Sequence, residues 1–269
     1  MTELGGLQLV ITRPRPQAEP WAIQLRELGA QVDVIPLLEI IPVQQPEHIQ
    51  AIKNCILDFD LYSKAIFVSQ NAVEFGFEWL ENYWPQLPIG IDFFAVGETT
   101  AKLIERKGAR VTDLAFSQSG AMTSEALLQA PALQQVSGEK MVIFRGLGGR
   151  THLGDELRAR GARVDYCELY ERCLPEDAEA QFAQLLQQPV EQRVILLHSG
   201  EALENLIKVI TSLANVTAYK MAMQLLVPSQ RIKVLALEAG FVQVCAAQNA
   251  TDAAMLQGLA EIKRNLKKV

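Results

Sequence analysis

The chain has 269 residues, which at roughly 100–200 residues per domain means one large domain or two of ordinary size. Hydrophobic residues make up 49% and charged residues 21%, a composition that supports a packed core and excludes a mainly disordered protein. The net charge is −6 and the pI is about 5.3. This acidity disfavours a general nucleic-acid binder, because such proteins are basic.

Cysteine and histidine usage indicates neither a disulfide scaffold nor a metal site. None of the four cysteines forms a Cys-x-x-Cys pair, which fits a reducing compartment. The three histidines lie far apart, so a zinc site is disfavoured. The N-terminus lacks the pattern of a signal peptide, and no run of about 18 apolar residues is present. We therefore expect a soluble, cytoplasmic protein without membrane association.

Segments of the first half of the chain recur in the second half. Residues 25–32 resemble residues 157–164, and the same offset carries Arg13 onto Arg145. Three further pairs follow in the same order at nearly the same offset: 68–73 with 198–203, 96–108 with 227–240, and 123–126 with 251–254. Ordered matches of this kind indicate a duplication, so we predict two similar units.

The elements predicted in chain order alternate between strand and helix. Residues 7–12 form a first apolar strand, Pro14, Pro16 and Pro20 keep the next stretch open, and a helix over about 21–28 ends at Gly29. The later elements are strands at 32–36 and 65–68, then a strand at 141–144, a loop at 146–149, a helix at 153–160, and strands at 164–169 and 194–197. Strands this apolar belong in parallel sheets covered by helices. We predict an α/β fold with two similar doubly wound parallel-sheet domains.

The residues that follow the predicted strands point to an anionic ligand. Ligands of open α/β sheets bind beyond the carboxyl ends of the strands. These positions hold mainly hydroxyls, glycines and arginines, at 12–13, 69–71, 97–100, 145–146, 199–200 and 228–231. Several of them precede predicted helices, whose first N–H groups attract anions. The ligand is expected to carry several carboxylates or phosphates.

The loop from Gly146 to Thr151 nearly matches a dinucleotide-binding Gly-x-Gly-x-x-Gly motif, with Asp165 about twenty residues further on. Thr151 stands where the last glycine is required. The flanking Arg145 and Arg150 favour direct carboxylate binding. An anion-binding turn is the preferred interpretation, and a nucleotide loop and a purely structural turn are the alternatives.

Four side chains near the strand ends have two interpretations each. Arg13 forms a surface ion pair or binds an acidic ligand. Ser69 and Ser199 are helix N-caps or ligand-binding groups, and neither sits in the Gly-x-Ser-x-Gly turn of a hydrolase nucleophile. His198 is a packing or hydrogen-bonding residue, or an alternative proton donor.

Tyr166 and Tyr170 are four positions apart in one predicted strand. Side chains with this spacing point to the same face of a strand. Tyrosines in strands are commonly packing residues, so the pattern alone assigns neither of them a function.

Short motifs along almost the whole chain, from about Leu7 to Leu259, resemble those of the uroporphyrinogen-III synthase family. They come in family order at 10–14, 67–73, 95–97 with 100–101, 145–146 with 149–150, 164–172 and 229–240. Each motif alone is weak, and the ordered set is specific. Val68 and His198 stand where threonine is frequent, and residues 230–231 replace a common threonine-alanine pair. These departures bear on individual side-chain contacts more than on the fold.

The resemblance implies a cyclising lyase of tetrapyrrole biosynthesis, the route to haem, sirohaem, chlorophyll and cobalamin. Its substrate is hydroxymethylbilane, a linear tetrapyrrole with eight carboxylates. Loss of water gives an azafulvene, ring D attacks through its substituted carbon, and the resulting spiro intermediate recloses as uroporphyrinogen III with ring D inverted. The family uses no metal or organic cofactor. We expect a monomer in transient contact with hydroxymethylbilane synthase.

The resemblance also implies two α/β domains joined by a two-stranded linker, with the active site in the cleft between them. The first domain would hold residues 1–36 and 174–269, and the second residues 37–173. The general acid would be Tyr170. The substrate-binding residues would be Arg13, Ser69, Asn71, Thr100, Arg145, Gly149, Arg150, Ser199, Gly200 and Ser229.

Two other functions compete with this one. A non-catalytic bilobal sensor of an anionic small molecule would have the same fold. A nucleotide-dependent transferase would use the Gly146 loop, against which the missing glycine at position 151 argues.

Overall fold

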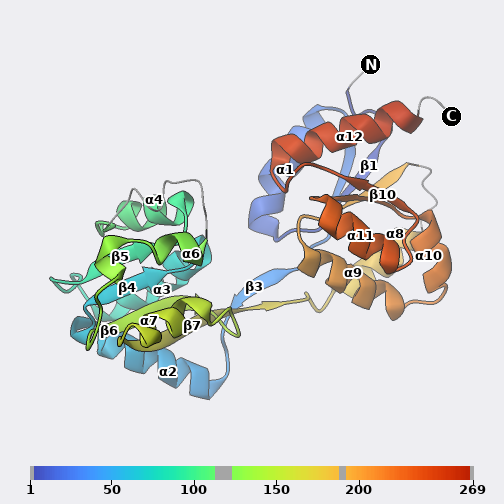
Figure 1. Ribbon diagram of the computed structural model, residues 1–269. Coiled ribbons are helices and arrows are strands. Elements are labelled where there is room, and N and C mark those ends of the chain that lie inside the picture. Colours follow the sequence, from blue (N-terminus) through green and yellow to red (C-terminus); the bar gives the residue numbers. More distant parts are fainter. Residues whose placement is uncertain (1–2, 113–122, 188–191, 267–269) are drawn as a thin grey trace. The chain divides into compact units, whose positions relative to one another are not determined.

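The computed structural model describes residues 3–112, 123–187 and 192–266 (Figure 1). The chain divides into two compact units: unit 1 comprises Met1–Glu39 and Cys173–Val269, and unit 2 comprises Ile40–Arg172. The sequence placed these boundaries at 36/37 and 173/174. None of the helices in the described ranges has the length and apolar character needed to cross a bilayer.

Unit 1 is built on a parallel sheet with the strand order β10-β9-β8-β1-β2. Its strands are β1 (Gln8–Ile11), β2 (Gln31–Val34), β8 (Arg193–Leu196), β9 (Gln224–Val227) and β10 (Gln243–Ala246). One face of the sheet packs against α1 (Arg15–Glu27) and α12 (Asp252–Leu266). The other face packs against α8 (Ala178–Gln187), α9 (Gly200–Thr211), α10 (Val216–Ala222) and α11 (Gln230–Glu238). Helices on both faces make this sheet doubly wound, as predicted.

Unit 2 has a second five-stranded sheet, with the order β3-β7-β6-β4-β5. Its strands are β3 (Glu39–Pro42), β4 (Lys64–Phe67), β5 (Asp92–Ala95), β6 (Lys140–Gly146) and β7 (Arg163–Cys173), and β5, β4, β6 and β7 pair in parallel. One face packs against α2 (Pro46–Leu57), α3 (Gln70–Tyr83) and α4 (Glu98–Arg106), with a 3-10 turn at Phe59–Leu61. The other packs against α6 (Ser124–Leu127), α7 (His152–Ala159) and a 3-10 turn at Pro131–Leu133.

The duplicated segments do not coincide with the two units. By the repeat, β1 and β2 correspond to β6 and β7, while β4 and β5 correspond to β8 and β9. The matching neighbours are β2-β1-β8-β9 in unit 1 and β7-β6-β4-β5 in unit 2. Each unit therefore combines the first part of one repeat with the second part of the other. This exchange requires the chain to pass twice between the units, which it does at β3 and β7 (Figure 1).

Helix α1 begins at Arg15, earlier than the start near residue 21 that the prolines predicted. Pro16 lies in the first turn, where a helix needs no N–H donor, and Pro20 is accommodated inside the helix. Burial of one side of the helix outweighs the proline penalty, with Ala18, Trp21, Ala22 and Leu25 recurring at helical spacing in the core. As a result, a helix starts only two residues after Arg13.

Strand β7 contains a register shift that the sequence did not reveal. Arg145 pairs with Glu168, but the next residue, Gly146, pairs with Tyr170. The extra residue on β7 interrupts the alternation of side chains, as a β-bulge does. Tyr170 consequently joins the core on the α3 side of the sheet, while Tyr166 packs on the α7 side. The prediction that both tyrosines face the same side is wrong.

Candidate active site

Three predicted binding serines cap the helices that follow the strand ends. The Oγ atoms of Ser69 and Ser199 each accept a hydrogen bond at 3.1 Å from the N–H group three residues further on, and that of Ser229 does so at 3.4 Å. A serine cap satisfies one orphan donor of the first helical turn. The remaining N–H groups of the turn favour an anion, so the cap and the ligand-binding interpretations are compatible.

Tyr170 lies beside one of these capping serines in unit 2. Its hydroxyl is 2.9 Å from the Oγ of Ser69, and either atom can be the donor. The ring is buried and stacks on Phe75 with a centroid distance of 5.6 Å. Because Ser69 Oγ already accepts from the N–H of Ala72, its own proton is free to be donated to Tyr170. In that arrangement the phenol proton is available to a ligand.

Gly146 provides the space that the Tyr170 ring occupies. A Cβ atom at position 146 would lie 2.6 Å from Cε2 of Tyr170, closer than packed atoms approach. The β-bulge and this glycine together place the tyrosine over the end of β6. Gly146, which the sequence assigned to an anion-binding turn with a nucleotide loop as an alternative, serves here to accommodate the tyrosine ring.

The guanidinium of Arg145, the residue before this glycine, is held by contacts with other residues of unit 2. It donates to the carbonyl oxygens of Gly146 at 3.3 Å and Arg150 at 3.1 Å. It also lies 3.5 Å from the carboxylate of Glu168 and 4.5 Å from the ring centroid of Tyr166. The side chain is only 5% exposed. These contacts make Arg145 the anchor of the loop that follows β6.

The glycines of this loop bring the backbone close to the anchored arginine. A Cβ atom on Gly149 would lie 2.7 Å from Nη2 of Arg145. Gly148 has a φ of +67° and donates its N–H to the carboxylate of Glu168 at 3.2 Å. Arg150 is exposed, so its side chain is open to a ligand from solvent.

Two further predicted binding residues lie at neighbouring helix starts in unit 2. Asn71 is a half-buried residue in the first turn of α3, and Thr100 is buried in the first turn of α4. Gly97, which precedes α4, has a φ of +87°, a conformation that glycine adopts without strain. Both side chains therefore lie at helix N-termini, where an anion is favoured.

In unit 1, Arg13 forms a cluster with three other side chains. Its Nη1 lies 2.8 Å from the Oδ1 of Asp252, and its guanidinium carbon is 5.0 Å from the ring centroid of Trp21. Trp21 meets His198 edge-on at a centroid distance of 5.2 Å. Burial lowers the pKa of His198 to about 4, and the nearby charge of Arg13 contributes to the shift. His198 is therefore neutral near pH 7.

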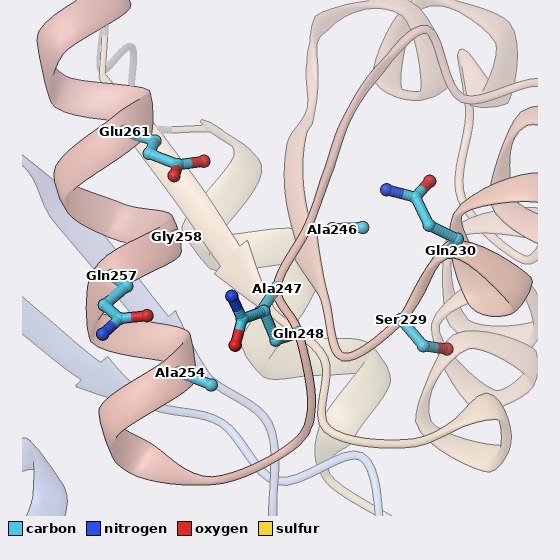
Figure 2. A pocket seen from close by; sticks show the side chains of 9 residues that line it. All are labelled: Ser229, Gln230, Ala246, Ala247, Gln248, Ala254, Gln257, Gly258 and Glu261. Atoms are coloured by element: carbon cyan, nitrogen blue, oxygen red, sulfur yellow. The ribbon is translucent and has the colours of Figure 1, made fainter.

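A pocket of about 290 Å³ opens beside Ser229 (Figure 2). Its walls come from the start of α11, the residues that follow β10, and one side of α12. Polar groups on these walls include the amides of Gln230, Gln248 and Gln257 and the carboxylate of Glu261. The pocket is large enough for a carboxyalkyl substituent and lies next to a helix N-terminus.

Gly200 allows the starts of α9 and α11 to lie close together. A Cβ atom on this residue would be 3.1 Å from Cδ1 of Ile232. The N-terminal turns capped by Ser199 and Ser229 are thus neighbours at one edge of the sheet.

Comparison with known proteins identifies the chain's relatives. Residues 19–257 match the family model described as Uroporphyrinogen-III synthase HemD. The chain belongs to the uroporphyrinogen-III synthase family. Uroporphyrinogen-III synthase of Escherichia coli (strain K12) is 34% identical over 256 residues, covering 94% of this chain and all of that protein. That of Salmonella typhimurium is 32% identical over 94% of this chain and all of its own length.

Solved structures of the same family share the fold. A mutant uroporphyrinogen III synthase from the extremely thermophilic bacterium Thermus thermophilus has a TM-score of 0.61, with 18% identity, over 98% of this chain and all of that one. Uroporphyrinogen-III synthetase from Helicobacter pylori has a TM-score of 0.55, with 16% identity, over 97% of this chain and 99% of that one. The predicted family and fold class are confirmed.

The structure distributes the predicted site residues of this synthase-family chain over both units. Ser69, Tyr170, Arg145, Gly149 and Arg150 form a connected series of contacts in unit 2, where Asn71 and Thr100 also lie; Arg13, Ser199, Gly200 and Ser229 lie in unit 1. Their roles toward a ligand stay predictions.

Sequence reasoning missed Asp252, Trp21 and Glu168 as partners of the two arginines. Asp252 lies 239 positions from Arg13, so no local spacing pattern connects them.

Proposed function

We propose that this chain is a uroporphyrinogen-III synthase that cyclises hydroxymethylbilane to uroporphyrinogen III with inversion of ring D. The observation that carries the proposal is the partly buried Ser69–Tyr170 hydroxyl pair at a β-bulge in a chain of this family. A bulge re-aims a side chain and is frequent beside active sites. A phenol that receives a hydrogen bond from serine is oriented to donate its own proton.

Tyr170 acts in the first step by protonating the hydroxyl of the substrate. As the C–O bond breaks, its electrons stay on oxygen, which leaves as water, and the lone pair of the pyrrole nitrogen completes the azafulvene. Ring D then attacks through its substituted carbon, and the spiro intermediate fragments and recloses. The last pyrrole carbon loses a proton as aromaticity returns, and tyrosinate 170 accepts it. Ser69 holds the phenol oxygen throughout.

The larger task of the protein is to hold one folded conformation of the substrate. Uncatalysed ring closure is fast but gives isomer I, so selectivity comes from orientation. The capped helix N-termini supply backbone N–H donors for the substrate carboxylates. The pocket beside Ser229 accepts one of the substrate's acetate or propionate groups.

The proposal extends to the setting of the reaction. The four cysteines are free thiols, which supports a reducing compartment such as the cytoplasm. Because hydroxymethylbilane closes spontaneously to the wrong isomer, we propose that the monomer receives it by transient contact with hydroxymethylbilane synthase.

The test is to generate hydroxymethylbilane enzymically, add the protein, oxidise the products and separate isomers I and III. Wild-type protein should yield isomer III. Tyr170→Phe should slow the reaction by up to about 10²–10⁴-fold, the range for loss of a general acid. We expect the lower end, because the azafulvene forms readily without acid.

Tyr166→Phe is the matched control, because it removes a hydroxyl from the same strand on the opposite face of the sheet. Full rate and pure isomer III from Tyr170→Phe would show that this tyrosine only packs. Only isomer I from the wild-type protein would exclude the synthase activity and leave a non-catalytic anion sensor.

A further inference from the structure

The cluster around Arg13 contains buried polar atoms without partners. Within residues 3–112, 123–187 and 192–266, Nε of Arg13 is buried and has no hydrogen-bond partner. Both ring nitrogens of His198 are buried and have no partner at ordinary hydrogen-bond geometry, although the backbone of Leu196 faces the ring. Buried polar atoms are almost always hydrogen-bonded, so such exceptions need an explanation. The Nε–H of Arg13 and the one N–H of the neutral His198 ring both need an acceptor, and both residues follow adjacent strands, which indicates that an acceptor binds there.

The acceptor that Arg13 now has is the more exposed partner of the pair. The Arg13 side chain is 15% exposed and that of Asp252 is 45% exposed, so solvent reaches the carboxylate more readily than the guanidinium. Asp252 binds the guanidinium through Nη1 alone. A carboxylate that bridged Nε and a terminal nitrogen would make the stronger bidentate pair.

We propose that Arg13 and His198 form a carboxylate site that Asp252 occupies in the free protein and that a carboxylate of the substrate takes over. The proposal rests on the proposed function, which supplies the polycarboxylate. The ligand accepts from the Nε–H of Arg13 and from the single N–H of the neutral His198 imidazole. Trp21 packs against both side chains and fixes their separation. Displaced Asp252 remains at the N-terminus of α12, where a negative charge is favoured.

The charged groups that face His198 determine how its pKa changes when a ligand binds. They are the guanidinium of Arg13 after β1 and the carboxylate of Asp252 at the start of α12, and the backbone of Leu196 also faces the ring. A bound carboxylate adds negative charge beside the imidazole and raises its pKa from the low value of the free protein. Substrate binding therefore favours protonation of the His198 ring.

The equivalent arginine of unit 2 does not share this arrangement. Arg145 is 5% exposed, donates to two backbone carbonyls, and pairs with a carboxylate that is only 27% exposed. If Arg145 exchanged these partners for a ligand, the loop after β6 would lose the contacts that hold it. Displacement is thus specific to the unit 1 arginine.

The kinetic test is Asp252→Asn, which removes the internal competitor and keeps the shape of the side chain. The KM for hydroxymethylbilane should fall about two- to fivefold, the size of a partly exposed ion pair, with kcat unchanged. In an Arg13→Gln background the same change should have no effect. Glu19→Gln is the matched control, since it removes a carboxylate paired with Arg15 at 3.5 Å on α1. An unchanged or higher KM in Asp252→Asn would overturn the proposal.

A second readout separates this site from the activity. Nitrogen-15 spectra of the Arg13 Nε–H and His198 ring should shift when uroporphyrin III, the stable oxidised form of the proposed product, is added. Shifts in a protein that makes no isomer III would refute the proposed function and keep the carboxylate site. Normal synthesis of isomer III with both signals unmoved by uroporphyrin III would refute the site and keep the function.

Discussion

Units 1 and 2 share the order of four of their five strands, but their strand ends carry different side chains. Tyr170 of unit 2 corresponds, through the repeat, to Leu38 of unit 1, which has no hydroxyl. The serines that cap the equivalent helices, Ser69 and Ser199, are kept in both units, but among the described residues only Ser69 bonds a tyrosine. The comparison teaches that the duplicated frame supplies the capped helix starts twice, while the bulge in β7 adds the proposed proton donor, Tyr170, once.

The largest expected effect comes from filling the space that Gly146 leaves for the Tyr170 ring. Gly146→Ala should destabilise unit 2 by about 1–3 kcal/mol, the cost of an overpacked site, because the new Cβ collides with the Tyr170 ring. The rate of isomer III formation should fall by about 10²-fold or more as the phenol is displaced. Urea unfolding and the isomer assay measure the two effects.

Gly154→Ala is its control on the opposite face, where the new Cβ meets the hydroxyl of Tyr166. It should lower stability comparably without a matching loss of rate. Equal rate losses in both variants would mean that strand β7 as a whole, rather than Tyr170, is needed.

The next largest effect should be a loss of stability of unit 1 on acidification, because His198 is buried there. The pKa of His198 is lowered from 6.5 to about 4, so the folded state binds fewer protons than the unfolded state between these values. The stability of unit 1 should therefore fall as the pH drops from 6.5 to 4. The loss is at most about 3 kcal/mol, since one pKa unit is worth about 1.4 kcal/mol.

Urea titrations at pH 7 and pH 5 measure this loss. His198→Asn should remove much of the difference between the two values. His152→Asn, which changes an exposed histidine of unit 2, should leave it in place. The same pH dependence in wild type and His198→Asn would contradict the assignment.

The smallest effects should separate the two equivalent capping serines. Ser69→Ala and Ser199→Ala each remove an N-cap, which costs about 0.5–2 kcal/mol of stability. Ser69→Ala should also lower kcat, because Tyr170 loses its partner, whereas Ser199→Ala should mainly raise KM. Steady-state kinetics of both variants test this division. A raised KM with normal kcat in Ser69→Ala would make the two serines equivalent.

The sequence revealed the duplicated frame because apolar strands and ordered repeats are local patterns. It missed two features for physical reasons. Strand periodicity assumes an uninterrupted ladder, so one extra residue in β7 reversed the predicted face of Tyr170. Proline preferences predicted a late start for α1, but burial of Trp21 and Leu25 in the core overrode them.

The contacts of the candidate site were harder to predict than its positions. Strand-end placement selected Arg13 and Arg145 from the sequence. Their bonds to Asp252 and to the loop carbonyls depend on how distant segments pack, and no single segment encodes that.

The exchange of segments between the repeats has a consequence for synthesis on the ribosome. Unit 2 is one continuous stretch, so all of its strands exist once residue 172 has left the exit tunnel. The strand β1 emerges first of all, yet one of its two neighbours, β8, follows about 180 residues later. One edge of β1 in the nascent chain therefore stays unpaired until β8 has been made. Unit 2, although it is made after β1, is complete before then.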